Sequence, residues 1–229
     1  MPHRKLRKLL ENNRQWVAEQ VAADPQYFDR LKSVHDPHFL WIGCSDARVP
    51  ANVVTGTMAG EMFVHRNIAN LVVPTDTNML AVLQYAVEVL RVEDIIVCGH
   101  EGCGGVRAAM GTGAPPIVDN WLAGVRTVLR LHEDELSAIT DEDARYARLV
   151  QLNVAEQVYN LSRTPVVQQA WAQGQTLRLH GWVYALTDGI LRDLGVTRGG
   201  SEPPEADEPV RELPGVAERR AREPELRAG

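Results

Sequence analysis

The chain has 229 residues, of which 45% are hydrophobic and 24% charged, and its formal net charge at pH 7 is −6. This length and composition predict a globular protein with one sizeable core, and the acidic balance argues against the basic surface of a non-specific nucleic-acid-binding protein. Three cysteines are too few for a disulfide framework, and no stretch reaches the roughly 18 apolar residues of a membrane-spanning helix. We therefore expect a cytoplasmic protein that binds neither nucleic acid nor membranes.

The first part of the chain predicts a helix followed by two strands. Leu6–Val21 carries apolar side chains at helical spacing, which is typical of an amphipathic helix, and we assign it to an N-terminal helical arm over residues 1–30. Phe39–Ile42 is a short apolar run closed by a glycine, and Glu61–Asn67 is a second strand-like segment. Both predict strands of an α/β sheet.

A helix and a third strand follow. Thr75 or Asp76 is placed to cap the helix, and Ile95–Val97 is again a short apolar run ahead of a glycine. A strand–helix–strand connection of this kind favours parallel pairing. We therefore predict an α/β fold with a mainly parallel central sheet flanked by helices, in a domain over residues 31–198.

The second half of the chain is predicted to be mostly helical up to a last strand. The helical pattern over residues 119–159 has acidic interruptions at 132–135 and 141–143. Leu177–Tyr184 alternates as a strand does, and Asp188-Gly189 favours a turn or loop after it.

Residues 199–229 differ in composition from the rest of the chain. Five of the thirteen prolines lie there among glutamates and arginines, with little apolar periodicity. Such a segment cannot bury enough apolar surface to offset its ordering entropy. We therefore expect a charged, proline-rich C-terminal tail.

Candidate metal ligands follow two of the predicted strands. Cys44 and Asp46 come after the first strand, and His100 and Cys103 come after the third. Because the carboxyl ends of parallel strands meet at one edge of a sheet, we expect these side chains to converge, and thiolate, imidazole and carboxylate are the ligands of zinc. The alternatives are buried cysteines that act as small hydrophobes and a surface ion pair between Asp46 and Arg48.

Three segments resemble the signatures of the β-class carbonic anhydrases, namely W-I-G-C-S-D-A-R-V-P, F-V-H-R-N-I-A-N and I-I-V-C-G-H-E-G-C-G-G. The resemblance covers all but the tail and implies zinc held by Cys44, His100 and Cys103, with water or Asp46 as the fourth ligand. It further implies the reversible hydration of carbon dioxide to bicarbonate and a proton, by attack of a zinc-bound hydroxide. Asp46 and Arg48 would then act as a catalytic dyad and as a pH switch.

The resemblance also bears on regulation. A subset of this family switches with pH and binds bicarbonate in a second, non-catalytic pocket through Trp, Arg and Tyr side chains. Trp41, Arg66 and Tyr184 stand at the matching positions, although the two aromatic residues would serve equally well in the core or at an interface. The sequence departs from the family pattern at His35, where Gln is frequent, and at Asn52, where switching relatives commonly have Glu.

The substrate pocket and the oligomeric state are implied in the same way. Phe63 and Tyr85 resemble the apolar pocket wall for carbon dioxide, with Gly104 as a further pocket residue, and both aromatic side chains would also suit a core. The resemblance implies a homodimer, or a tetramer built from dimers, with the active site at the dimer interface. The N-terminal helix would pack onto the partner.

Two other functions stay open. One is a hydrolase for carbonyl sulfide or carbon disulfide with the same fold. The other is a non-catalytic zinc protein in which Asp46 never leaves the metal. Arg48 favours the hydratase over the non-catalytic protein, because a purely structural zinc site does not require it.

Overall fold

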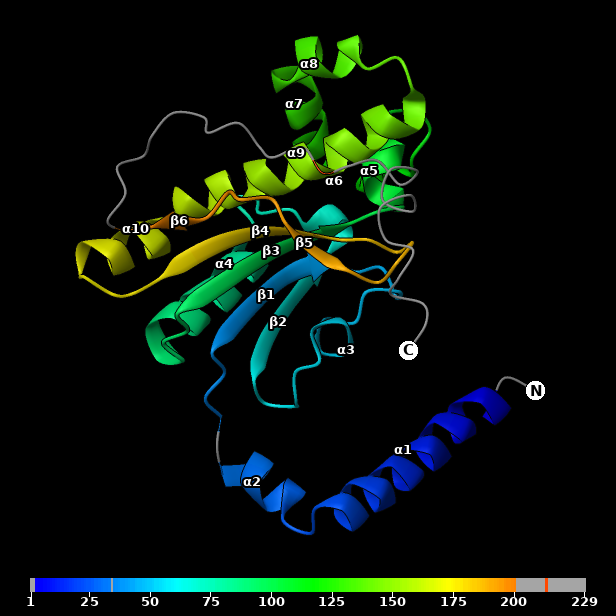
Figure 1. Ribbon diagram of the computed structural model, residues 1–229, viewed down its shortest axis with the longest axis vertical. Helices are drawn as coiled ribbons and strands as arrows, with labels where there is room; N and C mark the ends of the chain where they lie inside the picture. Colours follow the sequence, from blue (N-terminus) through cyan, green and yellow to red (C-terminus); the bar gives the residue numbers. More distant parts are fainter. Residues whose placement is uncertain (1–2, 34, 201–212, 214–229) are drawn as a thin grey trace, which may run out of the picture.

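The computed structural model describes residues 3–33, 35–200 and 213, and these residues form a six-stranded sheet with helices packed mainly on one face (Figure 1). The strand order is β2-β1-β3-β4-β5, and β6 also pairs with β4. Strands β2, β1, β3 and β4 are parallel, whereas β5 and β6 run antiparallel to β4. The predicted mainly parallel sheet is thus confirmed. The strands are β1 (Phe39–Cys44), β2 (Met62–Asn67), β3 (Asp94–His100), β4 (Arg178–Tyr184), β5 (Leu191–Asp193) and β6 (Arg198–Gly199).

Ten α-helices are present in the described part of the chain, and none of them combines the length and apolarity needed to cross a lipid bilayer. A single 3-10 turn (Ile68–Asn70) follows β2, and a π-helical turn (Tyr85–Val89) extends α4. The helices are α1 (His3–Ala23), α2 (Tyr27–Ser33), α3 (Ala51–Thr55), α4 (Thr77–Gln84), α5 (Gly104–Ala109), α6 (Pro116–Trp121), α7 (Ala123–Leu131), α8 (Glu133–Ala138), α9 (Glu142–Ser162) and α10 (Pro165–Ala172).

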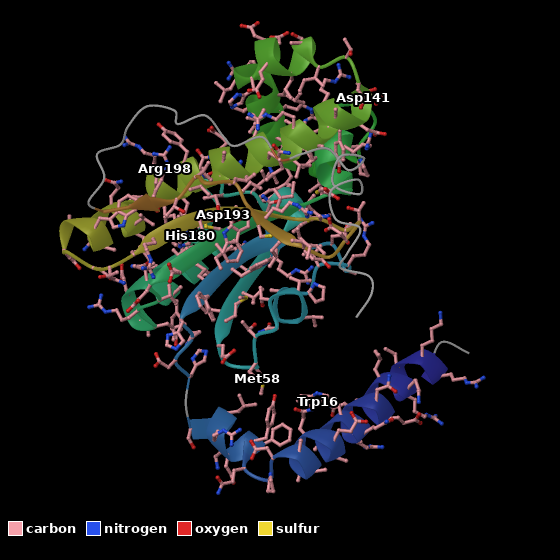
Figure 2. All side chains as sticks on the ribbon, viewed as in Figure 1. Trp16, Met58, Asp141, His180, Asp193 and Arg198 are labelled. Atoms are coloured by element: carbon pink, nitrogen blue, oxygen red, sulfur yellow. The ribbon has the colours of Figure 1, made fainter. Side chains whose placement is uncertain are left out.

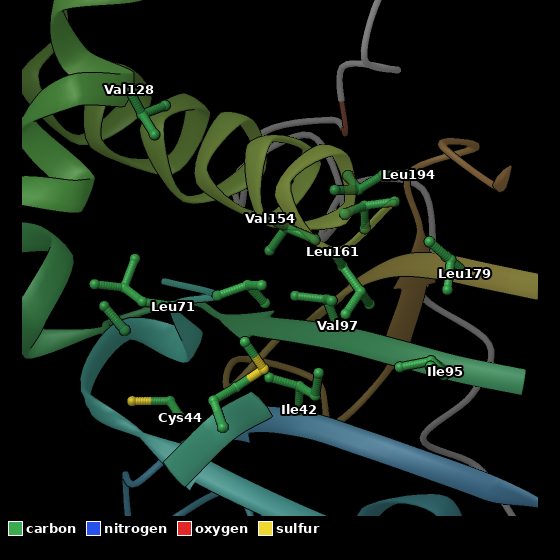
Figure 3. Close-up of a cluster of buried hydrophobic side chains, with 14 of the residues drawn as sticks. Ile42, Cys44, Leu71, Ile95, Val97, Val128, Val154, Leu161, Leu179 and Leu194 are labelled. Carbon is green, nitrogen blue, oxygen red and sulfur yellow. The ribbon is translucent and has the colours of Figure 1, made fainter. Parts of the chain in front are cut away.

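The main core lies between the sheet and α9. Strand β1 is apolar and buried along nearly its whole length, as expected of a central parallel strand covered on both faces. Ile42 and Val97 point from the sheet towards Val154 and Leu161 of α9 (Figure 3). Each fully buried aliphatic side chain of this kind contributes roughly 1.5–3 kcal/mol, so α9 is held firmly against β3 and β4.

The opposite face of the sheet is only partly covered. A smaller cluster around Trp41, Ile96 and Cys98 lies there under α3. Beside it, Phe39, Met62, Ile96, Trp182 and other residues line an open groove of about 450 Å³. This face therefore keeps apolar surface exposed in the single chain.

The predicted N-terminal helix is confirmed as α1, but it lies away from the sheet (Figures 1 and 2). Its contacts are with α2, where Trp16 packs edge-on against Tyr27 and Phe28 at ring-centroid distances of 6.1 and 5.8 Å. Leu6 and Leu9 on the same helix are 62% and 63% exposed. The N-terminal half of the apolar stripe of α1 thus has no cover from the described part of its own chain.

Several local predictions are confirmed or corrected. Asp76 rather than Thr75 caps α4, accepting a hydrogen bond of 3.0 Å from the Asn78 N–H. The predicted break at 132–135 is wrong for its last three residues, because only His132 leaves the helical conformation and α8 begins directly after it. The second predicted break, at 141–143, is wrong for its last two residues, which begin α9; Asp141 is the cap of this helix and accepts from the Ala144 N–H.

The remaining differences concern the last part of the chain. Helix α10 was not predicted, although Thr164 followed by Pro165 is a recognisable helix start. The turn at Asp188-Gly189 is confirmed and joins the antiparallel strands β4 and β5. Of the predicted tail, only residues 199, 200 and 213 are described, and the rest lies outside the described residues.

A partly exposed polar network joins β3 to β4 at the end of the sheet far from the predicted metal ligands. Asp94 accepts two hydrogen bonds of 2.7 Å from Arg178 and one of 2.8 Å from His180, which lies within the sheet in Figure 2. Burial acts to raise the pKa of Asp94, but the hydrogen bonds from Arg178 and His180 outweigh it and lower that pKa. The ionised carboxylate therefore stabilises the fold.

We expect Asp94→Asn to lower the free energy of unfolding by about 1–2 kcal/mol at pH 7, because it removes a charge that accepts three hydrogen bonds. A lowered folded-state pKa means that this contribution is present above the pKa of the unfolded chain, about 3.9, and is lost as the pH falls through the folded value. The difference in free energy of unfolding between Asp94→Asn and the wild type should therefore become smaller at acidic pH. Urea unfolding at several pH values measures it, with the exposed Asp36→Asn as the control.

Candidate metal centre

Three buried side chains converge at the carboxyl edge of the sheet. Cys44 ends β1, His100 ends β3, and Cys103 directly precedes α5. Their ligand atoms all lie within 4.8 Å of one another, and the two Sγ atoms are 3.9 Å apart. Two thiolates bound to one tetrahedral zinc ion at about 2.3 Å would lie roughly 3.8 Å apart, so this spacing fits a shared metal ion.

His100 is oriented for the same purpose. Its Nδ1 atom lies 2.8 Å from the backbone carbonyl of Glu101 and donates to it, which leaves the lone pair on Nε2. Nε2 is buried, and no hydrogen-bond partner for it exists within the described part of the chain. A buried nitrogen of this kind is expected to have a partner, and a metal ion bound by the neighbouring thiolates would supply one.

The thiols of Cys44 and Cys103 shift each other's pKa in opposite directions. The hydrogen bond from Cys103 is the largest cause that lowers the pKa of Cys44, and His100 and the N–H of Ala69 act in the same direction. The pKa of Cys103 is raised, first by this same interaction with Cys44 and then by burial. The pair alone therefore carries one negative charge readily and the second only at high cost, and a bound divalent cation would stabilise both thiolates.

Asp46 lies beside this cluster in a fixed orientation. Its carboxylate accepts hydrogen bonds from Arg48 Nε at 2.9 Å and from the terminal guanidinium nitrogen at 2.7 Å, and these bonds hold the pKa of Asp46 well below its ordinary value. Its Oδ2 atom is 3.8 Å from His100 Nε2. Arg48 also donates to the Gly102 carbonyl at 3.1 Å, so it links the two metal-binding loops.

Three residues that were not predicted support the loop beside Cys44. Ala69 has a left-handed backbone (φ 64°) and places its N–H against the Cys44 thiol. The Asn153 side chain on α9 donates to the Ala69 carbonyl at 3.1 Å, and Gln157, one turn later, accepts from the Val72 N–H at 2.9 Å. The sequence signal was an amide pair at i, i+4 on a helix face that is otherwise apolar.

The residues of the predicted bicarbonate pocket lie near the same loops. Trp41 is fully buried on the open face, and its indole N–H has no hydrogen-bond partner in the part of the chain that the structure describes. Gly43 makes room for this indole, because a Cβ there would lie 2.2 Å from Trp41 Nε1. Arg66 donates to the carbonyls of Cys44 and Asp46.

Other predicted residues have different surroundings. Tyr184 belongs to the cluster on the open face, with Trp182 as a neighbour. Asn52, which departs from the family pattern, uses its amide to donate to Thr57 and Met58. Tyr184 nevertheless pairs in register with His100, and its carbonyl accepts a hydrogen bond of 3.0 Å from the Glu101 N–H.

The predicted substrate-pocket residues are not all close to the metal ligands of their own chain. Gly104 lines an open hollow of about 480 Å³ together with Cys103. Phe63 pairs in register with Leu40, four residues before Cys44, and is therefore about 13 Å from it along the strand. The Phe63 ring lies 5.9 Å from that of Tyr85, which is 46% exposed and so does not belong to the core.

Comparisons with known proteins agree with this geometry. Residues 39–191 match the family model described as carbonic anhydrase. A carbonic anhydrase of Emericella nidulans is 49% identical over 189 residues, which cover 82% of this chain and 83% of that protein. Each of the residues Cys44, Asp46, His100 and Cys103 lies within the region that the family model matches.

Solved structures are similar as well. A structure reported among two tetrameric β-carbonic anhydrases of Sordaria macrospora has a TM-score of 0.80 and 39% identity, covering 85% of this chain and 98% of that one. The β-carbonic anhydrase of Coccomyxa, in complex with acetazolamide, has a TM-score of 0.79 and 37% identity, covering 82% of this chain and 85% of that one.

We expect the purified protein to bind one equivalent of Zn²⁺, and Cys103→Ser to weaken that binding by at least about 100-fold, because a thiolate ligand is lost. Competition with a chromophoric chelator measures the affinity. Cys98→Ala is the matched control, since Cys98 is buried on the other face of the sheet and should bind metal as the wild type does. Equal affinity in Cys103→Ser and wild type would contradict the metal centre.

Proposed function

Because the chain belongs to the β-class carbonic anhydrases, we propose that it catalyses the reversible hydration of carbon dioxide to bicarbonate and a proton. The observation that carries this proposal is the convergence of Cys44, His100 and Cys103, with ligand atoms within 4.8 Å, beside the Asp46–Arg48 pair. Two thiolates and an imidazole favour zinc as the metal. When bound, zinc would act as a Lewis acid and lower the pKa of a coordinated water.

The charge of the ligand set bears on the pH at which the enzyme would work. The thiolates of Cys44 and Cys103 would cancel the two positive charges of zinc, whereas neutral imidazole ligands would not. Bound zinc would therefore lower the pKa of the reacting water less than in a site built from three histidines. We propose that activity rises towards alkaline pH.

We propose that Asp46 accepts a hydrogen bond from the reacting water. Held by Arg48, its carboxylate can accept a hydrogen bond from that water and so direct a lone pair towards carbon dioxide. The distance of 3.8 Å between Asp46 Oδ2 and His100 Nε2 also leaves the carboxylate near enough to become the fourth metal ligand after a small movement. Arg48 would then decide between an active and a closed form, which is the proposed pH switch.

The contacts of Arg66 support a regulatory bicarbonate site. Arg66 donates to the carbonyls of Cys44 and Asp46, which belong to the loop of the proposed switch. A bicarbonate ion that bound Arg66 and the unpartnered indole N–H of Trp41 would withdraw these hydrogen bonds from the loop. We propose that Tyr184 completes this pocket and that bicarbonate favours the form in which Asp46 binds the metal.

The exposed apolar surfaces support a homodimer or a dimer of dimers. The stripe on α1 and the groove on the open face of the sheet are both uncovered in the single chain. Phe63 lies about 13 Å from Cys44 along the strand direction, and its ring is 5.9 Å from that of Tyr85, so we propose that these two rings line the pocket of a second copy. The related structures of Sordaria macrospora are described as tetrameric.

A reducing compartment such as the cytoplasm is the proposed location. Cys44 and Cys103 are both free, with Sγ atoms 3.9 Å apart. In an oxidising compartment two thiols this close would be prone to form a disulfide, which would remove two metal ligands.

We expect the zinc-loaded protein to accelerate carbon dioxide hydration, and Arg48→Ala to lower kcat/KM by about 100-fold at unchanged zinc content, because Asp46 loses its orientation. Stopped-flow measurement with a pH indicator gives the rate, with the exposed Arg130→Ala on α7 as the control. A zinc-loaded wild type with no activity at alkaline pH would support the non-catalytic protein. Hydrolysis of carbonyl sulfide or carbon disulfide without carbon dioxide hydration would support the alternative enzyme.

Trp41→Phe tests the regulatory site, because it removes the indole N–H and keeps an aromatic ring in the core. We expect about tenfold weaker inhibition by bicarbonate, the loss of one hydrogen bond of about 1.4 kcal/mol. Trp182→Phe is a matched control, since Trp182 also has an unpartnered indole N–H in the described structure and lines the separate groove. Equal inhibition of both variants and wild type would argue against the site.

A further inference from the structure

The metal-binding loop is tied to a distant helix by one tyrosine. Tyr146, in the second turn of α9, donates its hydroxyl hydrogen to the Cys103 carbonyl at 2.9 Å. Tyr146 is 5% exposed, so this hydrogen bond lies away from solvent. It connects the candidate ligand to an element that packs along the sheet and is itself firmly held.

The carbonyl that Tyr146 contacts controls the surroundings of the Cys103 thiol. Cys103 is the cap of α5, and its carbonyl also accepts the first hydrogen bond of that helix, from the Arg107 N–H at 3.1 Å. The N–H groups of Gly105 and Val106, in the first turn of α5, donate to the Cys103 thiol. The orientation of the peptide group between Cys103 and Gly104 therefore determines the geometry of the hydrogen bonds that the Cys103 thiol accepts.

The loop itself has little stiffness. Its sequence is Gly-Cys-Gly-Gly, and Gly102 has a left-handed backbone with φ of 67°. Glycine residues leave many backbone conformations accessible, so an external contact has to select the one that points Cys103 towards Cys44 and His100. The hydroxyl of Tyr146 is such a contact.

Tyr146 is in turn held from its other side. The Arg107 guanidinium lies over its ring, 4.0 Å from the centroid, and Arg107 forms an ion pair with Asp143 of α9 at 3.0 Å. The ring is thus enclosed between α5 and α9. Because its position is restrained, little conformational freedom is lost when the hydroxyl orients the carbonyl.

We propose that Tyr146 is a positioning residue for the metal centre, whose hydroxyl fixes the Cys103 peptide group and so holds the thiolate in the orientation that binds zinc. This inference rests on the proposed metal site. Groups that orient metal ligands from outside typically change metal affinity by 10–100-fold when they are removed. Loss of the Tyr146 hydroxyl should therefore weaken metal binding without removing a ligand.

The test compares Tyr146→Phe with Tyr159→Phe in the full chain. Both changes remove one hydroxyl from α9, but Tyr159 is 43% exposed and lies roughly 20 Å further along the helix. Zn²⁺ affinity is measured by chelator competition, and the thiolate-to-metal charge-transfer band is recorded for protein loaded with Co²⁺. We expect about tenfold weaker Zn²⁺ binding and an altered Co²⁺ band in Tyr146→Phe, with Tyr159→Phe unchanged from wild type.

A purely structural role for Tyr146 gives a different result. The Tm of the metal-free Tyr146→Phe protein would then fall, while its Zn²⁺ affinity and Co²⁺ band would stay those of the wild type. This outcome would overturn the proposal. A wild type that binds no Zn²⁺ would overturn the metal site and the role of Tyr146 together. If Tyr146→Phe does not fold, 4-aminophenylalanine at position 146 keeps a donor at the end of the ring. It should retain wild-type affinity, and a tenfold loss there would also contradict the proposal.

Discussion

The candidate site depends on two buried thiols that lie 3.9 Å apart beside an imidazole nitrogen with no protein partner in the described structure. Without a cation this arrangement is unfavourable, because the second thiolate forms next to the first in a poorly hydrated place. The surrounding hydrogen bonds, from Arg48 to Asp46 and from His100 to the Glu101 carbonyl, keep these groups in place. These three side chains therefore form a site whose chemistry fits a divalent metal ion.

The sheet and α9 together make this arrangement rigid. Parallel pairing brings the ends of β1 and β3 to the same edge, so that Cys44 and His100 meet although they are far apart in sequence. Helix α9 packs on β3 and β4 and reaches both loops, through Asn153 to the Ala69 carbonyl and through Tyr146 to the Cys103 carbonyl. One helix that is anchored in the core thus braces both sides of the metal centre.

The single chain leaves its apolar surface unevenly covered. Most helices lie on one face of the sheet, while the other face carries an open groove and α1 exposes Leu6 and Leu9 (Figure 1). Burying such surface is favourable at roughly 25 cal/mol per Å². This gives a physical reason for assembly with a second copy, and the positions of Phe63 and Tyr85 connect that assembly to the proposed substrate pocket.

The sequence by itself determined the parallel sheet and predicted that Cys44, His100 and Cys103 meet at one of its edges, because short apolar strands and the residues directly after them are local features. Only the tertiary structure decided that Arg48 bridges two loops, that Phe63 lies about 13 Å from Cys44 along the strand direction, and that Tyr146 and Asn153 support the site. These last contacts end on backbone carbonyls, which every residue possesses. No residue type in the loops therefore marks them, and they depend on how α9 is packed against the sheet.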